Sequence, residues 1–275
     1  MAFSAEWLAL QREAQLAGEQ IAVGVTVLGR ANHAQTGLYA QALFGLSIGL
    51  ERLGKLIVIA DHAIESNGQF PTDTHLRRVG HDLSKLFPRC EKIGKRLDSN
   101  RAYAPRPVDP IHQGIERALS EFATTSRYYN LNHIAGAAGQ QTDPIALWWE
   151  IVAKPICDRH YSARQRAIGN AMASAMASAL GDRTMVLSHT EDGSEINTVD
   201  ALVTRGNVTA TVQKYGRLYS LQIVRWLASI LAELSHHGAY AMRIEPLLGL
   251  NEHFAIFCMD DAYLRDRKTW SIYSP

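Results

Sequence analysis

The feature that most constrains the fold of this 275-residue chain is a long apolar stretch that begins near Thr36. Its apolar residues recur at alternating spacings of four and three, the pattern of an α-helix packed lengthwise against other helices. They are Tyr39, Leu43, Leu46, Leu50, Leu53, Ile57 and Ala60, with Phe44 and Ile48 widening the face. Glu51, Arg52 and Lys55 lie within the stretch, and three central charges make a membrane span very costly. Glu51 and Lys55 are also spaced to pair on one helix face. The stretch therefore predicts the central helix of a bundle.

A second helical segment follows a polar loop at residues 65–73. The spacing of three and four continues through its apolar residues, which are Leu76, Val79, Leu83, Leu86, Cys90, Ile93 and Leu97. Pro88 lies inside this segment and predicts a kink or a break, because proline lacks a backbone N–H and clashes with the preceding turn. Asp82 is suited to cap a new helix start, since its carboxylate can accept a backbone N–H.

The rest of the chain is also predicted to be mainly helical. Asp109–Pro110 and Asp143–Pro144 each place an N-cap aspartate before a proline suited to the first helical position. Further expected elements are a connector over 100–110, a small-residue helix over 162–180, a hairpin over 184–196, and a long helix over about 209–237. Alternating residues over 254–259 and 269–273 predict two short strands in the tail. The predicted class is mostly all-α, a helical bundle with a short β-hairpin near the C-terminus.

Composition limits the functional classes without choosing one. The formal net charge of +1 gives no overall attraction to nucleic acid or to anionic lipid, so a nucleic-acid site has to be a local patch. Three widely separated cysteines fit a reducing compartment better than a disulfide framework. The first residues lack the basic and then apolar layout of a signal peptide. We therefore expect a soluble cytoplasmic protein that is not bound to a membrane.

Two short motifs of the first half resemble the HEPN domain, a family of helical bundles found in many prokaryotic toxin and defence proteins. The first motif is Leu46-Ser-Ile-Gly-Leu-Glu-Arg-Leu-Gly-Lys-Leu56, and the second is Gly80-His-Asp-Leu-Ser-Lys-Leu86. The resemblance covers at most residues 22–138. Together with the glycine-rich run at 135–141, it suggests a HEPN-like bundle over 1–139 and a second helical region over 140–275.

The resemblance implies a metal-independent endoribonuclease that leaves 2′,3′-cyclic phosphate ends and needs no cofactor. HEPN ribonucleases carry an Arg and a His separated by four to six residues, and five residues separate Arg127 from His133. In that family the His acts as a general base on the ribose 2′-hydroxyl and the Arg neutralises the phosphate. Tyr128, Asn130 and Asn132 are the expected supporting residues. RNA is the implied partner, and the family commonly forms homodimers, so a homodimer or higher homo-oligomer is expected.

Geometry leaves other interpretations open. On one continuous helix, residues six apart point about 120° away from each other, so a joint Arg127–His133 site needs a helix break or a second protomer. Arg77 and His81 form a second, shorter pair, although His81 can equally tie a loop to the bundle. A non-catalytic helical interaction module is one alternative function. A small-molecule-binding regulatory protein, with its pocket between the two halves, is another.

The central stretch also contains two matches to known catalytic sequence motifs. Gly49 to Lys55 has the spacing of a phosphate-binding loop, and Gly45 to Gly49 spells a nucleophile elbow. Both patterns fall inside a predicted helix, whereas both kinds of site require a turn. We therefore interpret these glycines as sites of close helix packing.

Overall fold

The computed structural model describes residues 3–97, 105–137, 139 and 141–273. Helices hold 74% of the chain and the described strands form a two-stranded sheet, which confirms the mostly all-α prediction. The α-helices are α1 (Ala5–Leu28), α2 (Gly37–Glu65), α3 (Asp73–Val79), α4 (Leu83–Arg96), α5 (Pro110–Glu121), α6 (Tyr129–Ile134), α7 (Pro144–Trp148), α8 (Lys154–His160), α9 (Ala163–Leu180), α10 (Val199–His236) and α11 (Asp261–Asp266). The π-helical turns are η1 (Phe122–Ser126), η2 (Trp149–Ala153) and η4 (His237–Ala241), and the 3₁₀ turns are η3 (Gly181–Arg183), η5 (Glu245–Leu247) and η6 (Glu252–Cys258). None of the helices in these ranges combines the length and apolarity needed to cross a bilayer.

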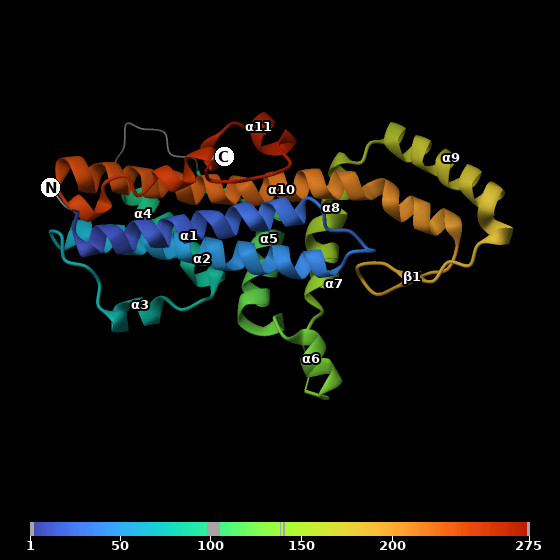
Figure 1. The fold of residues 1–275 in the computed structure, drawn as a ribbon, viewed down its shortest axis with the longest axis horizontal. Coiled ribbons are helices and arrows are strands. Elements are labelled where there is room, and N and C mark those ends of the chain that lie inside the picture. The colour runs from blue at the N-terminus through green and yellow to red at the C-terminus, as the bar shows by residue number, and fades with distance from the viewer. Residues whose placement is uncertain (1–2, 98–104, 138, 140, 274–275) are drawn as a thin grey trace.

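Helices α1 and α2 pack antiparallel along most of their length and form the centre of the bundle (Figure 1). The seven seam residues predicted for α2 are all buried. A Cβ atom added at Gly45 would lie 2.9 Å from the carbonyl oxygen of Gln20, and one added at Gly49 would lie 2.6 Å from Ile21. The glycines thus let the two backbones approach, which confirms that they serve packing.

Helix α10 joins the second half of the chain to the same core. It runs beside α1 and α2 and then extends beyond them, where it carries α9 and a small hairpin (Figure 1). The continuous buried cluster reaches from Leu10 in α1 to Trp270 near the C-terminus, so residues of both 1–139 and 140–275 contribute to it. Helix α10 begins about ten residues before the predicted start, because Thr198 caps it at the backbone N–H of Ala201.

Parts of two expectations fall on residues outside the described ranges. The predicted connector over 100–110 includes residues 100–104, and the glycine-rich boundary at 135–141 includes residues 138 and 140. The aspartate caps predicted before Pro110 and Pro144 are confirmed, since Asp109 and Asp143 accept the N–H groups of Ile111 and Ile145.

The predicted hairpin is confirmed, and the predicted tail strands are wrong. Strands β1 (Ser188–His189) and β2 (Glu195–Ile196) pair antiparallel. Residues 254–258, however, lie in the 3₁₀ turn η6, and the described part of 269–273 forms no strand. Phe254 and Phe257 are both fully buried, and their spacing of three places them on one side of a 3₁₀ turn rather than on opposite faces of a strand. Trp270 completes this packing by stacking near Phe257.

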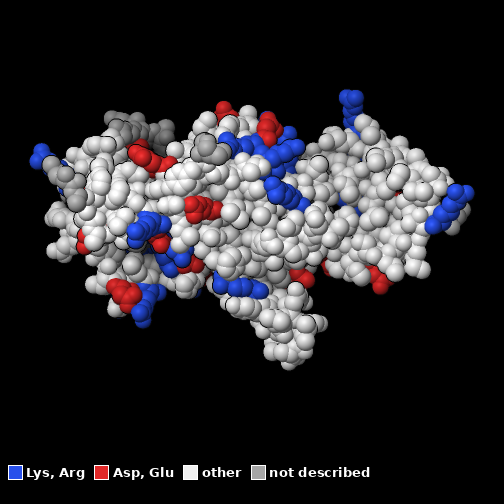
Figure 2. Space-filling model, viewed as in Figure 1, with Lys and Arg blue, Asp and Glu red and all other residues white. Residues whose placement is uncertain are grey.

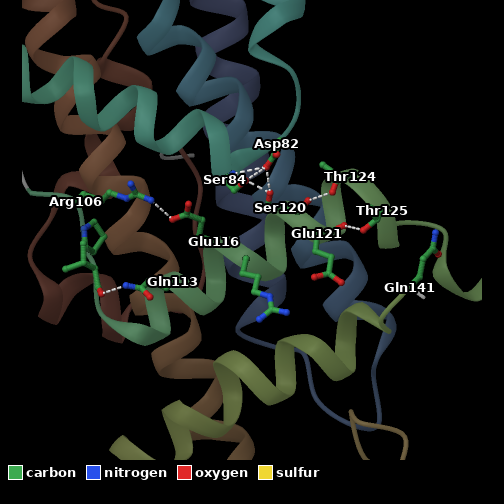
Figure 3. Close-up of a pocket in the computed structure, with 13 residues that line it drawn as sticks. Asp82, Ser84, Arg106, Gln113, Glu116, Ser120, Glu121, Thr124, Thr125 and Gln141 are labelled. Atoms are coloured by element: carbon green, nitrogen blue, oxygen red, sulfur yellow. Dashed lines mark hydrogen bonds and ion pairs between the residues drawn. The ribbon is translucent and has the colours of Figure 1, made fainter. Parts of the chain in front are cut away.

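The second helical segment is broken before Pro88, not at it. Helix α3 ends at Val79, Gly80 adopts a left-handed φ of 71°, and α4 then continues through Pro88. Asp82 caps α4 as predicted: its carboxylate accepts the Ser84 N–H at 3.0 Å and the Ser120 hydroxyl at 2.7 Å (Figure 3). The bonds from Ser84 and Ser120 lower the pKa of Asp82 to about 2.

Replacing Asp82 with alanine is expected to lower the free energy of unfolding by about 1–2 kcal/mol, because α4 loses its cap and Ser120 loses its acceptor. Since the folded-state pKa lies below the ordinary 3.8, this stabilisation is complete above that pH and is lost as the pH falls towards 2. Urea unfolding of both proteins at pH 7 and pH 3 measures the difference. A difference that grows on acidification would contradict this assignment.

Candidate functional site

Helix α5 does not run straight into the predicted Arg127–His133 motif. It passes into the π-helical turn η1, and the chain turns at Arg127 and Tyr128 before α6 begins. Within η1, the hydroxyls of Thr124 and Thr125 donate to the carbonyl oxygens four residues earlier, at 2.9 Å and 2.8 Å. Such bonds and π-turns bend helices, and they supply the helix break that a joint site requires.

Helix α6 carries the predicted motif away from the body of the bundle (Figure 1). It buries none of its residues, and Tyr128, Leu131 and Ile134 are 62%, 65% and 82% exposed. Arg127 and His133 are both exposed, as are Tyr128 and Asn130, while Asn132 donates to Gln141 at 3.1 Å.

Arg127 and His133 face different aromatic neighbours. The Arg127 guanidinium lies 5.1 Å from the ring centre of Phe44 in α2, a cation–π arrangement. The His133 ring stacks on Tyr129 within α6, with centroids 5.9 Å apart. A shallow pocket of about 200 Å³ is lined by Arg127 and Asn130 but not by His133. Within the described ranges no hydrogen bond joins the two side chains, so the structure does not bring this pair together in one chain.

The second pair, Arg77 and His81, lines one shared pocket of about 460 Å³ between α2 and α3. Its other lining residues are Glu13, Arg52, Lys55, Leu56, Ile59, Leu76 and Gly80. Figure 2 shows basic and acidic side chains close together on this part of the surface. Helix α2 supplies Arg52 and Lys55, while α3 and the loop after it supply Arg77 and His81.

The loop after α3 places His81 against Glu51. The Nδ1 atom of His81 lies 2.8 Å from a carboxylate oxygen of Glu51, whose side chain is only 15% exposed. An ionised carboxylate only accepts hydrogen bonds, so Nδ1 is the donor in this contact, and whenever the ring is neutral Nε2 carries the lone pair. The His81 side chain is 74% exposed, so Nε2 is open to a ligand.

Three cations, Arg52, Lys55 and Arg77, line the same pocket as this histidine. Lys55 pairs with Glu51 at 2.7 Å, which confirms the predicted pair on α2. Arg52 pairs with Glu13 at 2.5 Å, and Arg77 pairs with Asp73 at 2.9 Å. The Arg77 side chain is 80% exposed, so its ion pair is weak and a phosphate can replace the carboxylate at little cost.

Glu51 is the residue of this site that the sequence did not assign to His81. Its spacing predicted only the pair with Lys55, because the contact with His81 joins a helix to a loop residue that follows 30 positions later. The available signal was that both residues lie in the two motifs that resemble the HEPN domain.

A larger hollow of about 870 Å³ lies between α4, α5 and the connector before α5 (Figure 3). Some of its polar groups pair with one another: Asp82 binds Ser84 and Ser120, and Arg106 donates to Glu116 at 2.7 Å. Apart from Gln141, its lining comes from residues 82–125, so it does not lie between the two predicted halves.

The described residues contain no cluster of three or more His, Cys, Asp or Glu side chains arranged to hold a metal ion. Comparisons with protein-family models, with curated proteins and with solved structures find no significant match to this chain. The resemblance to the HEPN domain stays a prediction.

Proposed function

We propose that this chain is an RNA-acting, HEPN-like protein that cleaves RNA without a metal ion, using His81 and Arg77. The observation that carries the proposal is the pocket that these two residues share, together with the contact by which Glu51 orients the imidazole of His81. The contact with Glu51 also ties the loop to α2. Tying the loop and orienting the ring are compatible, because a general base has to be held in place.

The proposed reaction needs only groups that line this pocket. Nε2 of His81 takes the proton of a ribose 2′-hydroxyl, and the resulting oxygen attacks the adjacent phosphorus. The bond from phosphorus to the 5′-oxygen breaks, and that oxygen receives a proton from the imidazolium or from water. The products are a 2′,3′-cyclic phosphate and a 5′-hydroxyl. Arg77, with Arg52 and Lys55, neutralises the charge that develops on the phosphate.

The pair Arg127 and His133 remains a prediction for the same chemistry. Because each side chain faces a different aromatic ring within one chain, a joint site there would combine Arg127 of one copy with His133 of another. The exposed Leu131 and Ile134 beside His133 would form the contact between two such copies.

The test is incubation of the purified full chain with a single-stranded RNA in the presence of EDTA. We expect cleavage that yields 2′,3′-cyclic phosphate and 5′-hydroxyl ends, identified by mass spectrometry. A DNA of the same sequence is the control, and it should stay intact because it lacks the 2′-hydroxyl. Intact RNA, or cleavage only after Mg²⁺ is added, would refute the proposal.

A second candidate function, a helical interaction module, is favoured by an exposed apolar stripe on α9. This helix buries only Gly169 and Ala173, and a Cβ at Gly169 would lie 2.9 Å from the Asn207 amide of α10. Beside this packed face, Ile168, Met172, Met176 and Leu180 form an exposed apolar stripe at spacings of four. Residues 167–180 carry no charge, so two such faces can pack together without burying an ionised group.

The chain is therefore expected to self-associate through α9, and replacing Met172 with lysine should shift it to the monomer of 30.5 kDa. The added ammonium would otherwise be buried without a partner in the dimer. Sedimentation velocity at several concentrations measures the shift. Lysine in place of the exposed Val108 on the connector before α5 is the control and should leave the oligomeric state unchanged. A wild-type chain that is monomeric at all concentrations would exclude this interface.

A further inference from the structure

Arg217 in α10 is a buried cation without a carboxylate partner among the described residues. Arg217 is only 4% exposed. One guanidinium nitrogen donates to the Arg265 carbonyl oxygen at 3.4 Å, and Nε has no hydrogen-bond partner in the described part of the chain. Burial lowers the pKa of Arg217, although Asp266 opposes this shift. A buried charge in this state is costly unless an anion accompanies it.

The chain makes room for this guanidinium at the end of α1. A Cβ atom added at Gly29 would lie 2.2 Å from the Nη1 atom of Arg217, so any larger residue would displace the side chain. Arg217 lines a pocket of about 300 Å³ whose other lining residues are Gly29, Ala210, Gln213, Lys214, Arg265, Asp266 and Lys268. Figure 2 shows basic side chains gathered where α10 passes α11.

Positive charge dominates this pocket. Four of its lining residues are cations, and its single carboxylate, Asp266, already pairs with Lys214 at 3.1 Å and with Arg265 at 3.3 Å. The side chain of Lys268 is exposed, and no ion pair involves it in the described residues. One ligand can therefore accept hydrogen bonds from four side chains. These are Arg217, Lys268, and the N–H groups of Lys214 and Arg265 that do not bind Asp266.

We propose that this pocket binds a phosphate group, with Arg217 as its central ligand. A tetrahedral dianion has several acceptor oxygens, which suits convergent guanidinium and ammonium donors. The volume is at the lower end for small-molecule sites and admits a phosphate with a small body attached. This pocket shares no lining residue with the pocket of Arg77 and His81, so it is separate from the proposed cleavage site. Helices α11 and α3 lie on opposite sides of the bundle (Figure 1). The ligand is either free phosphate or the phosphate group of a phosphomonoester.

Isothermal titration of the full chain at low salt tests this proposal, with sodium phosphate, adenosine 5′-monophosphate and adenosine as separate probes. We expect one site per chain for at least one of the two phosphates and none for adenosine. Tighter binding of the monophosphate would identify a phosphomonoester as the ligand, and the reverse would identify free phosphate. Replacing Arg217 with methionine should weaken binding at least about tenfold, since charge-assisted hydrogen bonds are lost.

The matched control is Lys92→Met, which removes an exposed positive charge from α4, away from this pocket. It should bind phosphate as the wild type does. Without phosphate, Arg217→Met should melt at the same temperature as the wild type or higher, because an uncompensated buried charge is gone. Phosphate should then raise the melting temperature of the wild type and of Lys92→Met, but not that of Arg217→Met. Absence of binding, or equal binding by Arg217→Met and the wild type, would overturn the proposal.

Discussion

Replacing His81 with alanine is expected to slow RNA cleavage by a factor of about 10² to 10⁴, the usual contribution of a positioned general base. The reason is that Glu51 binds Nδ1 of His81, so the lone pair of Nε2 is left to accept the proton. The substitution should cost little stability, since the histidine side chain is 74% exposed. The measurement is the initial rate of cleavage of a labelled RNA in EDTA, with circular dichroism to compare the folds.

His133→Ala is the matched control, because it removes a second exposed histidine that follows an arginine. It should cleave RNA at the wild-type rate if the chemistry occurs at His81. The opposite result, full activity in His81→Ala and loss in His133→Ala, would transfer the site to the projecting helix α6. A mixture of the inactive variants His133→Ala and Arg127→Ala would then regain activity if each copy supplies one residue to a shared site.

Replacing Glu191 with methionine is expected to lower the free energy of unfolding by about 3–5 kcal/mol, the typical cost of removing one partner of a buried ion pair. Glu191 lies in the hairpin turn, and its side chain is 4% exposed. It accepts from Nε of Arg205 at 2.7 Å and from the Tyr39 hydroxyl at 3.1 Å. Burial, together with Glu191, raises the pKa of Tyr39, so the phenol remains a neutral donor.

The large effect arises because Arg205 would stay buried without its carboxylate. Its side chain is 13% exposed, and its guanidinium lies 3.3 Å from the ring centre of Trp149, which prevents it from turning to solvent freely. Urea unfolding followed by circular dichroism measures the loss. Glu195→Met, on the exposed face of the same hairpin, is the control and should change stability by less than about 0.5 kcal/mol. Equal losses in the two variants would show that the ion pair contributes nothing.

The sequence predicted the parts of this fold that depend on local spacing. The apolar period located α2, and the aspartates before Pro110 and Pro144 marked two helix starts, because a cap acts within three residues. Pro88 was misinterpreted because the nearby Gly80 and Asp82 end one helix and begin the next, so the break did not have to occur at the proline. Phe254 and Phe257 fit a strand or a turn equally well until their neighbours are known.

The sequence predicted the residues of the candidate site but not their arrangement in space. Arg/His spacing singled out two pairs, but sequence spacing does not say which pair shares a pocket. That depends on the path of the loop after α3, which places His81 beside Glu51 of α2. The contact of Glu191 with Tyr39 and the close approach of Arg217 to Gly29 likewise join residues far apart in the chain, and no local pattern marks them.

The hairpin, the segment before it and the first turns of α10 have an apolar core of their own, made of Val186, Ile196 and Val199. Because this core is so small, it contributes little to the free energy of local unfolding. Glu191 connects this region to the main bundle through its buried hydrogen bond with Tyr39. The region should therefore behave as a separate cooperative unit. Its amide protons would exchange with solvent through sub-global unfolding, whereas those of α1 and α2 would exchange only through global unfolding.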